Sequence, residues 1–239
     1  MALFKEFSKK ADVIITVSES TKQDFLSFFD FPEDRIHTIP LAPSLKVNQE
    51  ITNNDIILKE LNVFPKEYFI SLGGVSLRKN TLNLIKGFAL SKASSEKKLV
   101  ITGKIESNQY VSVLEYIKEK RLEEKVLITG YLSSDSLSKL YQNAAAFLFP
   151  TFYEGFGIPI LEAMLTKLPV LTSNIGAAPE TAGGHAILIN PYEPDDIATG
   201  MDSLSSITDD QLEQAKKFAD TFTWEKTALE TKRVYEKYM

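Results

Sequence analysis

The sequence alternates short apolar runs with amphipathic segments, and this alternation constrains the fold more than any other feature of the chain. Each run is four or five residues long and nearly continuous, unlike the apolar–polar alternation of a strand with one face in water. Continuous runs are typical of parallel strands that helices cover on both faces. We expect strands at residues 13–17, 36–39, 68–72, 98–102, 126–129, 146–149, 169–172 and 186–189.

The amphipathic segments between the runs predict helices. In one of them, Tyr110, Leu114 and Ile117 have the spacing of a single buried stripe. Strands that alternate with helices form βαβ units with right-handed crossovers, so we predict an α/β fold with a Rossmann-like, doubly wound parallel sheet. Ligands of such sheets bind beyond the carboxyl ends of the strands, and we expect the chemistry in the loops there. The predicted helices lie at residues 21–29, 81–91, 110–120, 136–144, 158–166 and 195–204.

The beginning of the chain does not read as a complete domain. Residues 1–45 predict only two strands and one helix, too few for a core of their own. Pro40 and Pro43 then break regular structure, and residues 44–54 are polar and without periodicity, so we expect a linker near residues 42–50. We interpret residues 1–45 as the remnant of an N-terminal domain.

The end of the chain predicts helices without strands. Thr208 and Gln211 have the spacing of a capping box, and a last helix is expected to begin near Thr223. We therefore assign residues 46–222 to the Rossmann-like domain and residues 223–239 to a helix that crosses back to the N-terminal part.

The composition excludes several classes of protein. The absence of Cys excludes disulfides, Cys-ligated metals and thiol nucleophiles, and His37 and His185 are too few for a His-rich metal site. With 27 basic against 32 acidic residues the net charge is −5, so we expect no nucleic-acid partner. No stretch approaches the ~18 apolar residues of a membrane span, and charges from Lys5 onward interrupt any signal peptide. We expect a cytoplasmic protein with at most peripheral membrane contact.

A glycine-rich loop with two basic residues, SLGGVSLRKN, lies between a predicted strand and a predicted helix. Gly73 and Gly74 permit a positive φ and close backbone approach. Arg78 and Lys79 stand near the N-terminus of a helix, where phosphate binds well. The spacing differs from that of a Walker A loop. The alternative interpretation is a structural turn followed by solvated basic residues.

A second loop, FYEGFGIPILEAM, leads from a predicted strand into a helix. Gly155 and Gly157 leave backbone N–H groups accessible, and Pro159 suits the first helical position. The partial positive charge at the helix N-terminus favours phosphate there as well.

Two carboxylates, Glu154 and Glu162, bracket this turn. Carboxylates bind vicinal hydroxyls, as an acidic residue does on the ribose in dinucleotide sites. One carboxylate for each sugar of an elongated ligand, with phosphate between them, is chemically coherent. The alternative interpretations are a solvated loop acid for Glu154 and a first-turn Glu favoured by the helix dipole for Glu162.

A third loop, at residues 130–134, offers Tyr131 either for stacking on a base or as an aromatic residue at the rim.

Together these loops resemble the donor-binding half of GT-B glycosyltransferases, specifically of the retaining family 4 (glycosyl transferases group 1). EGFGIPILEAM resembles the E-x7-E signature, and GGVSLRKNTLNLIKGF resembles the diphosphate-clamping loop. GYLSSDSLSKLYQNAAAFLFPT resembles the base-contacting segment, and AGGHAILINPYEPDDIA and TFTWEKTALETKRVYEKY also look like family segments. The resemblance runs from about Ala11 to the C-terminus.

The resemblance implies an enzyme of polysaccharide biosynthesis. It transfers a hexosyl residue from a nucleotide-diphosphate sugar, UDP- or GDP-linked, to a glycan or glycoconjugate with retention, and needs neither a bound metal nor a cofactor. The implied catalytic residues are Arg78 and Lys79, which neutralise the diphosphate, and Glu154, which contacts the transferred sugar. The implied substrate-binding residues are Gly73, Gly74, Gly130, Tyr131, Leu132, Gly155, Phe156, Gly157, Ile158 and Glu162.

The chain departs from the family pattern in two places. Many members have Arg where Gly74 stands, and Arg78 can supply the missing charge. The family's acceptor loop and the catalytic His of its N-terminal domain have no counterpart, since neither His37 nor His185 lies in a matching context. A non-catalytic nucleotide-sugar-binding subunit or fragment therefore stays open as the alternative. It would need a second chain to supply the acceptor domain, and self-association is an equally open arrangement. A related epimerase agrees less well with the two acids.

Overall fold

The computed structural model describes residues 6, 10–44, 56–105 and 107–239. Most of the predicted linker near residues 42–50 lies outside the described residues. Within them, no helix combines the length and the apolar character needed to cross a bilayer.

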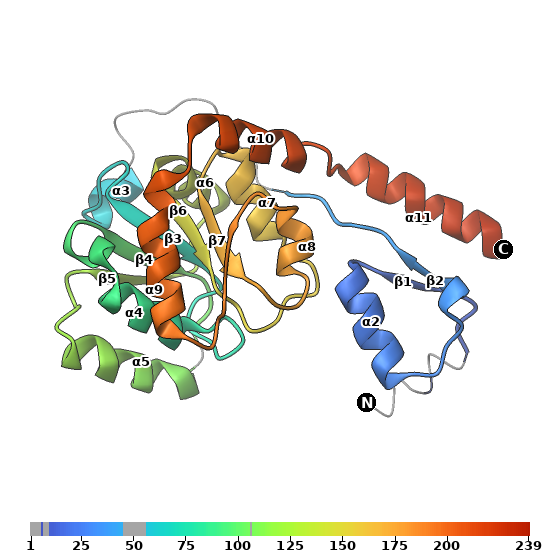
Figure 1. Ribbon diagram of the computed structural model, residues 1–239, viewed down its shortest axis with the longest axis horizontal. Coiled ribbons are helices and arrows are strands. Elements are labelled where there is room, and N and C mark those ends of the chain that lie inside the picture. Colours follow the sequence, from blue (N-terminus) through green and yellow to red (C-terminus); the bar gives the residue numbers. More distant parts are fainter. Residues whose placement is uncertain (1–5, 7–9, 45–55, 106) are drawn as a thin grey trace.

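The larger sheet has six parallel strands in the order β5-β4-β3-β6-β7-β8 (Figure 1). The order reverses between β3 and β6, so the crevice beyond their carboxyl ends is the topological switch point of a doubly wound sheet. The predicted α/β fold with a Rossmann-like parallel sheet is confirmed. The strands are β3 (Tyr68–Leu72), β4 (Lys98–Thr102), β5 (Val126–Gly130), β6 (Ala146–Phe149), β7 (Val170–Ser173) and β8 (Ile187–Ile189).

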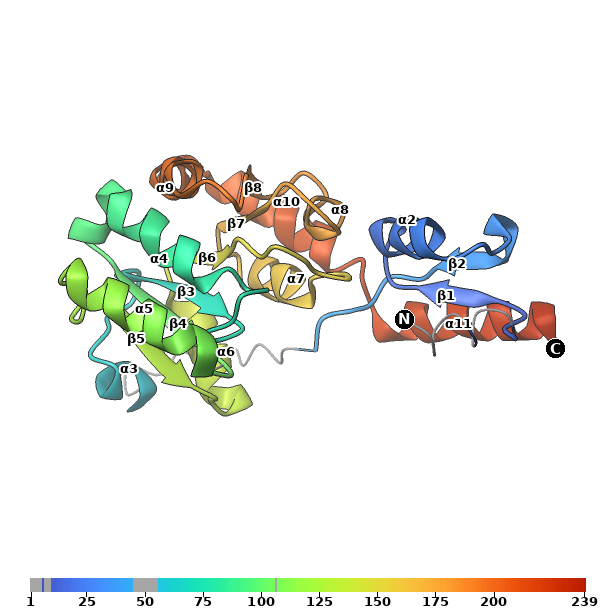
Figure 2. The same cartoon turned by 90° about the horizontal axis from the view of Figure 1, so that it is seen from below.

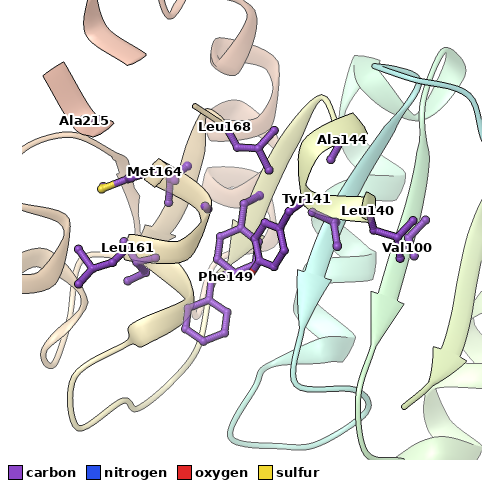
Figure 3. Close-up of a cluster of buried hydrophobic side chains, with 14 of the residues drawn as sticks. Val100, Leu140, Tyr141, Ala144, Phe149, Leu161, Met164, Leu168 and Ala215 are labelled. Atoms are coloured by element: carbon purple, nitrogen blue, oxygen red, sulfur yellow. The ribbon is translucent and has the colours of Figure 1, made fainter. Parts of the chain in front are cut away.

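Helices bury both faces of this sheet, because its strands are apolar on both sides. One face is covered by α3 (Ile56–Glu60), α6 (Ser134–Asn143), α7 (Ile158–Leu165), α8 (Ala178–Ala182) and α10 (Asp209–Ala219). The other is covered by α4 (Thr81–Leu90), α5 (Ser107–Glu119), α9 (Pro194–Ser203) and the 3-10 turns η2 (Lys92–Ser95) and η3 (Leu204–Ser206). Figure 3 shows part of the hydrophobic cluster on the face that α6 and α7 cover; Tyr141, Phe149 and Leu161 belong to this cluster.

The buried face of α5 differs from the predicted stripe. Val113 and Ile117 are buried, whereas Leu114 is 42% exposed, so the prediction for Leu114 was wrong. Tyr110, Val113 and Ile117 share one face of the helix at spacings of three and four residues, and this face meets the sheet. Leu114 lies one position further round, toward solvent.

A second, smaller unit precedes the six-stranded sheet. It consists of β1 (Ile14–Thr16), α2 (Glu19–Phe28), the 3-10 turn η1 (Glu33–Arg35) and β2 (Ile36–Thr38), and we call it the N-terminal unit. Its two strands pair in parallel and form a separate sheet.

The C-terminal helix α11 (Trp224–Tyr238) lies along this N-terminal unit rather than along the six-stranded sheet (Figures 1 and 2). Thr227 Oγ1 donates to the carbonyl of Pro40 at 2.7 Å, and His37 Nε2 lies 3.2 Å from the hydroxyl of Tyr238. The capping box of Thr208 and Gln211 and the start of α11 after Thr223 are both confirmed. The three-part division at residues 45 and 222 stays a prediction.

Candidate functional site

A cavity of about 540 Å³ opens beyond the carboxyl ends of β3, β4 and β5, next to the switch point. It combines basic side chains with an acid and apolar walls. Of the residues that the sequence singles out, Gly73, Arg78, Lys79, Tyr131, Leu132 and Glu162 line it. They lie on the loop after β3, the loop after β5 and the helix α7, which the sheet topology brings to one edge.

The two glycines after β3 make room for neighbouring parts of the site. A Cβ on Gly73 would lie 2.5 Å from the side chain of Lys79, whose stem crosses the loop there. A Cβ on Gly74, at φ +65°, would lie 1.8 Å from the carbonyl oxygen of Lys104. The N–H groups of both glycines donate to the carbonyl of Thr102 at 2.9 Å. Gly74 therefore serves close packing between two loops, outside the cavity wall itself.

Glu154 joins the two basic residues into one cluster. Its Oε1 accepts from Arg78 Nη1 at 2.7 Å and from Lys79 Nζ at 2.8 Å. The side chains of Lys79 and Glu154 are only 13% and 12% exposed, whereas that of Arg78 is 52% exposed. The structure thus places the three predicted catalytic side chains together, with Glu154 as the counter-ion of both cations.

Lys79 is held as a partly buried cation. Burial lowers the pKa of Lys79 from its usual value, and the nearby carboxylate of Glu154 opposes that shift. Its ammonium group also lies 4.4 Å from the centre of the Phe149 ring, a cation–π contact. An anion that enters the cavity would meet a desolvated positive charge, which attracts it more strongly than a solvated one.

The helix that carries Glu162 begins at the cavity. Gly157 caps α7 in the left-handed region, at φ +106°, and Ile158 and Pro159 are its first two residues. Pro159 therefore occupies the second helical position rather than the predicted first one; its missing N–H costs nothing, because the first four N–H groups have no partner within a helix. Pro159 and Glu162 both line the cavity, so the N-terminus of α7 faces it. The backbone N–H of Ser44 donates to Glu162 Oε1 at 3.3 Å.

Several of the predicted substrate-binding residues do not line the cavity. The side chain of Phe156 is buried and packs near Phe222, in the core. The carbonyl of Gly130 accepts from the N–H of Gly103 at 2.8 Å, which ties β5 to the loop after β4. Tyr131 is 80% exposed, at the rim. Gly74, Gly130, Gly155, Phe156, Gly157 and Ile158 do not line the cavity.

Sequence reasoning missed two contributors, Lys104 and Asn80. Lys104 follows β4 and lines the cavity as a third basic residue; its place after a strand was the available signal. Asn80 has φ +56°, and its Nδ2 donates to the carbonyls of Pro150 and Pro191 at 2.9 and 2.6 Å. It joins the loop of Lys79 to the ends of two other strands.

A second cavity, of about 510 Å³, lies at the opposite edge of the sheet and contains none of the predicted residues. Lys66, Lys92 and Lys97 contribute to its wall. It lies where α4 and α9 end, at Leu90 and Ser203, and the carboxyl ends of helices carry partial negative charge. This edge is therefore less suited to phosphate than the cavity beside α7.

Among the described residues, no group of three or more His, Cys, Asp or Glu side chains gathers as potential metal ligands.

Known proteins resemble this chain in sequence. The family model described as Glycosyl transferases group 1 matches residues 54–221. The serotype-specific mannosyltransferase WbdA of Escherichia coli is 31% identical over 234 residues, which cover 92% of this chain and 28% of that protein. The O-antigen chain mannosyltransferase B of Escherichia coli is 29% identical over 238 residues, which cover 95% of this chain and 61% of that protein. The chain thus spans less than two thirds of either relative.

A solved structure shares the fold. The crystal structure of Anabaena Alr3699/HepE in complex with UDP and glucose matches with a TM-score of 0.86 at 18% identity, and the match covers 99% of this chain and 66% of that one. The arrangement of strands and helices is that of GT-B glycosyltransferases.

Proposed function

This chain belongs to the family of glycosyl transferases group 1, and from that premise we propose that it is the donor-binding half of a retaining glycosyltransferase of family 4. The reaction is transfer of a hexosyl residue from a nucleotide-diphosphate sugar to a glycan or glycoconjugate acceptor. The observation that carries the proposal is the cluster of Arg78, Lys79 and Glu154 beside a cavity at the switch point of the sheet.

The charges of this cavity suit a diphosphate. Lys79, Arg78 and the N-terminus of α7 all line it, so they supply positive charge where a leaving diphosphate gains negative charge. Lys104 adds a third cation at the wall. We propose that these groups, rather than a bound metal, stabilise the leaving group.

The two acids suit the two sugars of the donor. Glu162 lines the cavity and in this proposal accepts hydrogen bonds from the hydroxyls of the ribose. In this proposal the diphosphate replaces Glu154 as the partner of Arg78 and Lys79. The released carboxylate of Glu154 then contacts the transferred sugar. The spacing of these acids resembles that of the family's retaining members, which supports the retention of configuration.

Mannose is the proposed sugar. Both relatives described above are named mannosyltransferases, and one of them is named for the O-antigen chain. The solved structure of HepE contains UDP and glucose, so a nucleotide and a sugar fit the same fold in that protein. We propose a nucleoside diphosphate linked to mannose as the donor and a surface polysaccharide as the acceptor. The cytoplasmic location and peripheral contact at most with a membrane stay predictions from the sequence.

Calorimetric titration of the chain with GDP, UDP and ADP, and with the mannose conjugate of the nucleotide that binds, tests the donor site. We expect one nucleotide to bind with a micromolar Kd, about −8 kcal/mol. Lys79→Met and Glu162→Gln should weaken that binding about tenfold, since each removes a charged contact worth about 1.5 kcal/mol. Lys97→Met, at the other edge of the sheet, is the matched control.

Glu154→Gln separates the roles of the two acids. It removes the carboxylate that competes with phosphate for Arg78 and Lys79, so the nucleoside diphosphate should bind at least as tightly as to the unchanged chain. The extra affinity that mannose adds should disappear. If none of the three nucleotides binds the unchanged chain, the proposal of a donor site is wrong.

A further inference from the structure

One backbone carbonyl of the loop that carries Glu154 accepts two hydrogen bonds from the N-terminal unit and its N-cap residue. The carbonyl of Gly155 accepts from Ser18 Oγ at 2.6 Å and from Thr21 Oγ1 at 2.9 Å. A carbonyl oxygen has two lone pairs, so these two hydroxyls occupy its full capacity. Ser18 is completely buried, and its Oγ also accepts from the N–H of Thr21 as the N-cap of α2.

A carboxylate from α8, a helix that covers the six-stranded sheet, completes the same helix end. Glu180, on α8, accepts from the N–H of Glu19 at 2.9 Å and from the N–H of Ser20 at 3.2 Å. Together with the Ser18 cap, it satisfies the three N–H groups of the first turn of α2, which have no partner within a helix. The negative charge also lies at the positive end of the helix dipole. Figure 2 shows α2 beside α8.

A third contact holds the residue before Glu154. The hydroxyl of Tyr153 donates to Asp24 Oδ2, on α2, at 2.8 Å, and this hydrogen bond raises the pKa of Tyr153. Side chains of α2 therefore bind the loop on both sides of Glu154 in sequence. We call the contacts of Ser18, Thr21 and Asp24 with Tyr153 and Gly155 the α2 clasp.

The clasp fixes the direction in which the loop presents its groups. Glu154 points its carboxylate at Arg78 and Lys79, while the next residue points its carbonyl at α2. In a trans peptide the C=O and N–H bonds point in opposite directions, so the Phe156 N–H is turned away from α2. Release of the Gly155 carbonyl would free that peptide to rotate and would loosen the backbone next to Glu154.

We propose that Ser18, Thr21 and Asp24 are positioning residues for the sugar of the donor, acting through the backbone of Tyr153–Gly155. This inference rests on the proposed function, in which Glu154 contacts that sugar. Contact between the N-terminal unit and the loop then completes the sugar subsite, whereas none of the described residues that line the cavity around Glu162 and Lys79 belongs to the N-terminal unit. The clasp thereby links the N-terminal unit to recognition of the sugar and leaves recognition of the nucleotide unchanged.

The test uses the full chain with the double variant Thr21→Val and Tyr153→Phe, which removes two clasp bonds and keeps both the shape of the side chains and the Ser18 cap. Ser27→Ala, at the other end of α2, is the control; its hydroxyl donates to the backbone carbonyl of Asp24 within the helix. Calorimetry compares the nucleoside diphosphate with its mannose conjugate. Hydrogen–deuterium exchange of the ligand-free chain follows the amides of residues 153–158.

The double variant should raise the Kd of the sugar nucleotide about tenfold and change that of the nucleoside diphosphate less than about twofold, as expected for the loss of two hydrogen bonds, one to a carbonyl and one to a carboxylate. The amides of residues 153–158 should exchange faster, and the control should change neither quantity. Equal weakening of both ligands, or no weakening, overturns the proposal. If the unchanged chain binds neither ligand, the proposed function fails, and unchanged exchange in the loop then overturns the clasp itself.

Discussion

Two buried tyrosines, Tyr68 and Tyr141, end in different surroundings. Tyr68 donates from its hydroxyl to the carbonyl of Leu140 at 2.7 Å. Tyr141, on α6, has a hydroxyl with no hydrogen-bond partner among the described residues, and burial raises the pKa of that hydroxyl well above its usual range. A buried polar group without a partner loses its hydrogen bonds to water and gains nothing in return. Both rings are fully buried. The hydroxyl of Tyr68 therefore stabilises the fold, whereas that of Tyr141 destabilises it.

Substitution of each by Phe should change stability in opposite directions. Tyr141→Phe removes the unpaired hydroxyl and should raise the free energy of unfolding by about 1 kcal/mol, whereas Tyr68→Phe removes a formed bond and should lower it by about 1 kcal/mol. Urea denaturation measures both, with equal m-values as the sign that the unfolded states are alike. Loss of stability in both variants would show that the Tyr141 hydroxyl has a partner in solution.

The loops after β3 and β4 lie against each other beside the cavity, and Gly74 allows this close approach. Gly74 and Gly130 both have positive φ, at +65° and +73°. A Cβ on Gly74 would collide with the carbonyl of Lys104, whereas a Cβ on Gly130 would meet nothing within 4 Å. Glycine is therefore needed at Gly130 for its backbone conformation alone. At Gly74 it is needed both for the conformation and for the close approach of the Lys104 carbonyl.

Substitution of each glycine by alanine measures how much each of these two effects contributes to stability. Gly130→Ala should cost about 1–2 kcal/mol of stability, the strain of a left-handed residue with a Cβ. Gly74→Ala should cost at least about 3 kcal/mol, because overpacking against a backbone carbonyl adds to that strain. Thermal unfolding followed by circular dichroism compares them. Equal losses would mean that the loop of Lys104 moves aside without cost.

At the scale of the whole molecule, the two sheets have unequal cores. In the N-terminal unit, α2 has no buried residue, and Thr16 alone is buried in β1. The six-stranded sheet lies between two large clusters of buried side chains. The N-terminal unit is held instead by α11 and by polar contacts with α8 and the loop of Glu154. It should open more easily than the larger sheet, since stability within a fold follows the local density of buried contacts.

Native-state hydrogen exchange at low urea concentrations tests this difference. Amides of β1 and β2 should exchange through a partial opening, with an opening free energy below that of global unfolding. Amides of β3, β4 and β6, in the middle of the larger sheet, should exchange only by global unfolding. Identical opening free energies in the two sheets would contradict the expected independence of the N-terminal unit.

Much of the architecture could be read from the sequence. The strands at residues 68–72, 98–102 and 146–149 were predicted with the bounds that the structure shows, and the other predicted elements differ by no more than three residues at either end. The short helix α3 was not predicted. Strands buried on both faces carry their signal locally, as continuous apolar runs, and the caps of α10 and α11 lie in a few adjacent residues. The loops with Gly73, Lys79, Glu154 and Glu162 were found because they follow such strands.

Which of these groups meet depends on how the elements pack. The pairing of Glu154 with both Arg78 and Lys79 and the attachment of Gly155 to α2 join residues that are 75 to 137 positions apart in the chain. Lys104 reaches the same cavity from the loop after β4. The exposure of Leu114 depended likewise on which face of α5 met the sheet. Periodicity and turn residues act over about one helical turn, so they determine the elements and their order. Contacts between elements depend on how the sheet is wound and on which backbones approach one another, and no local pattern records either.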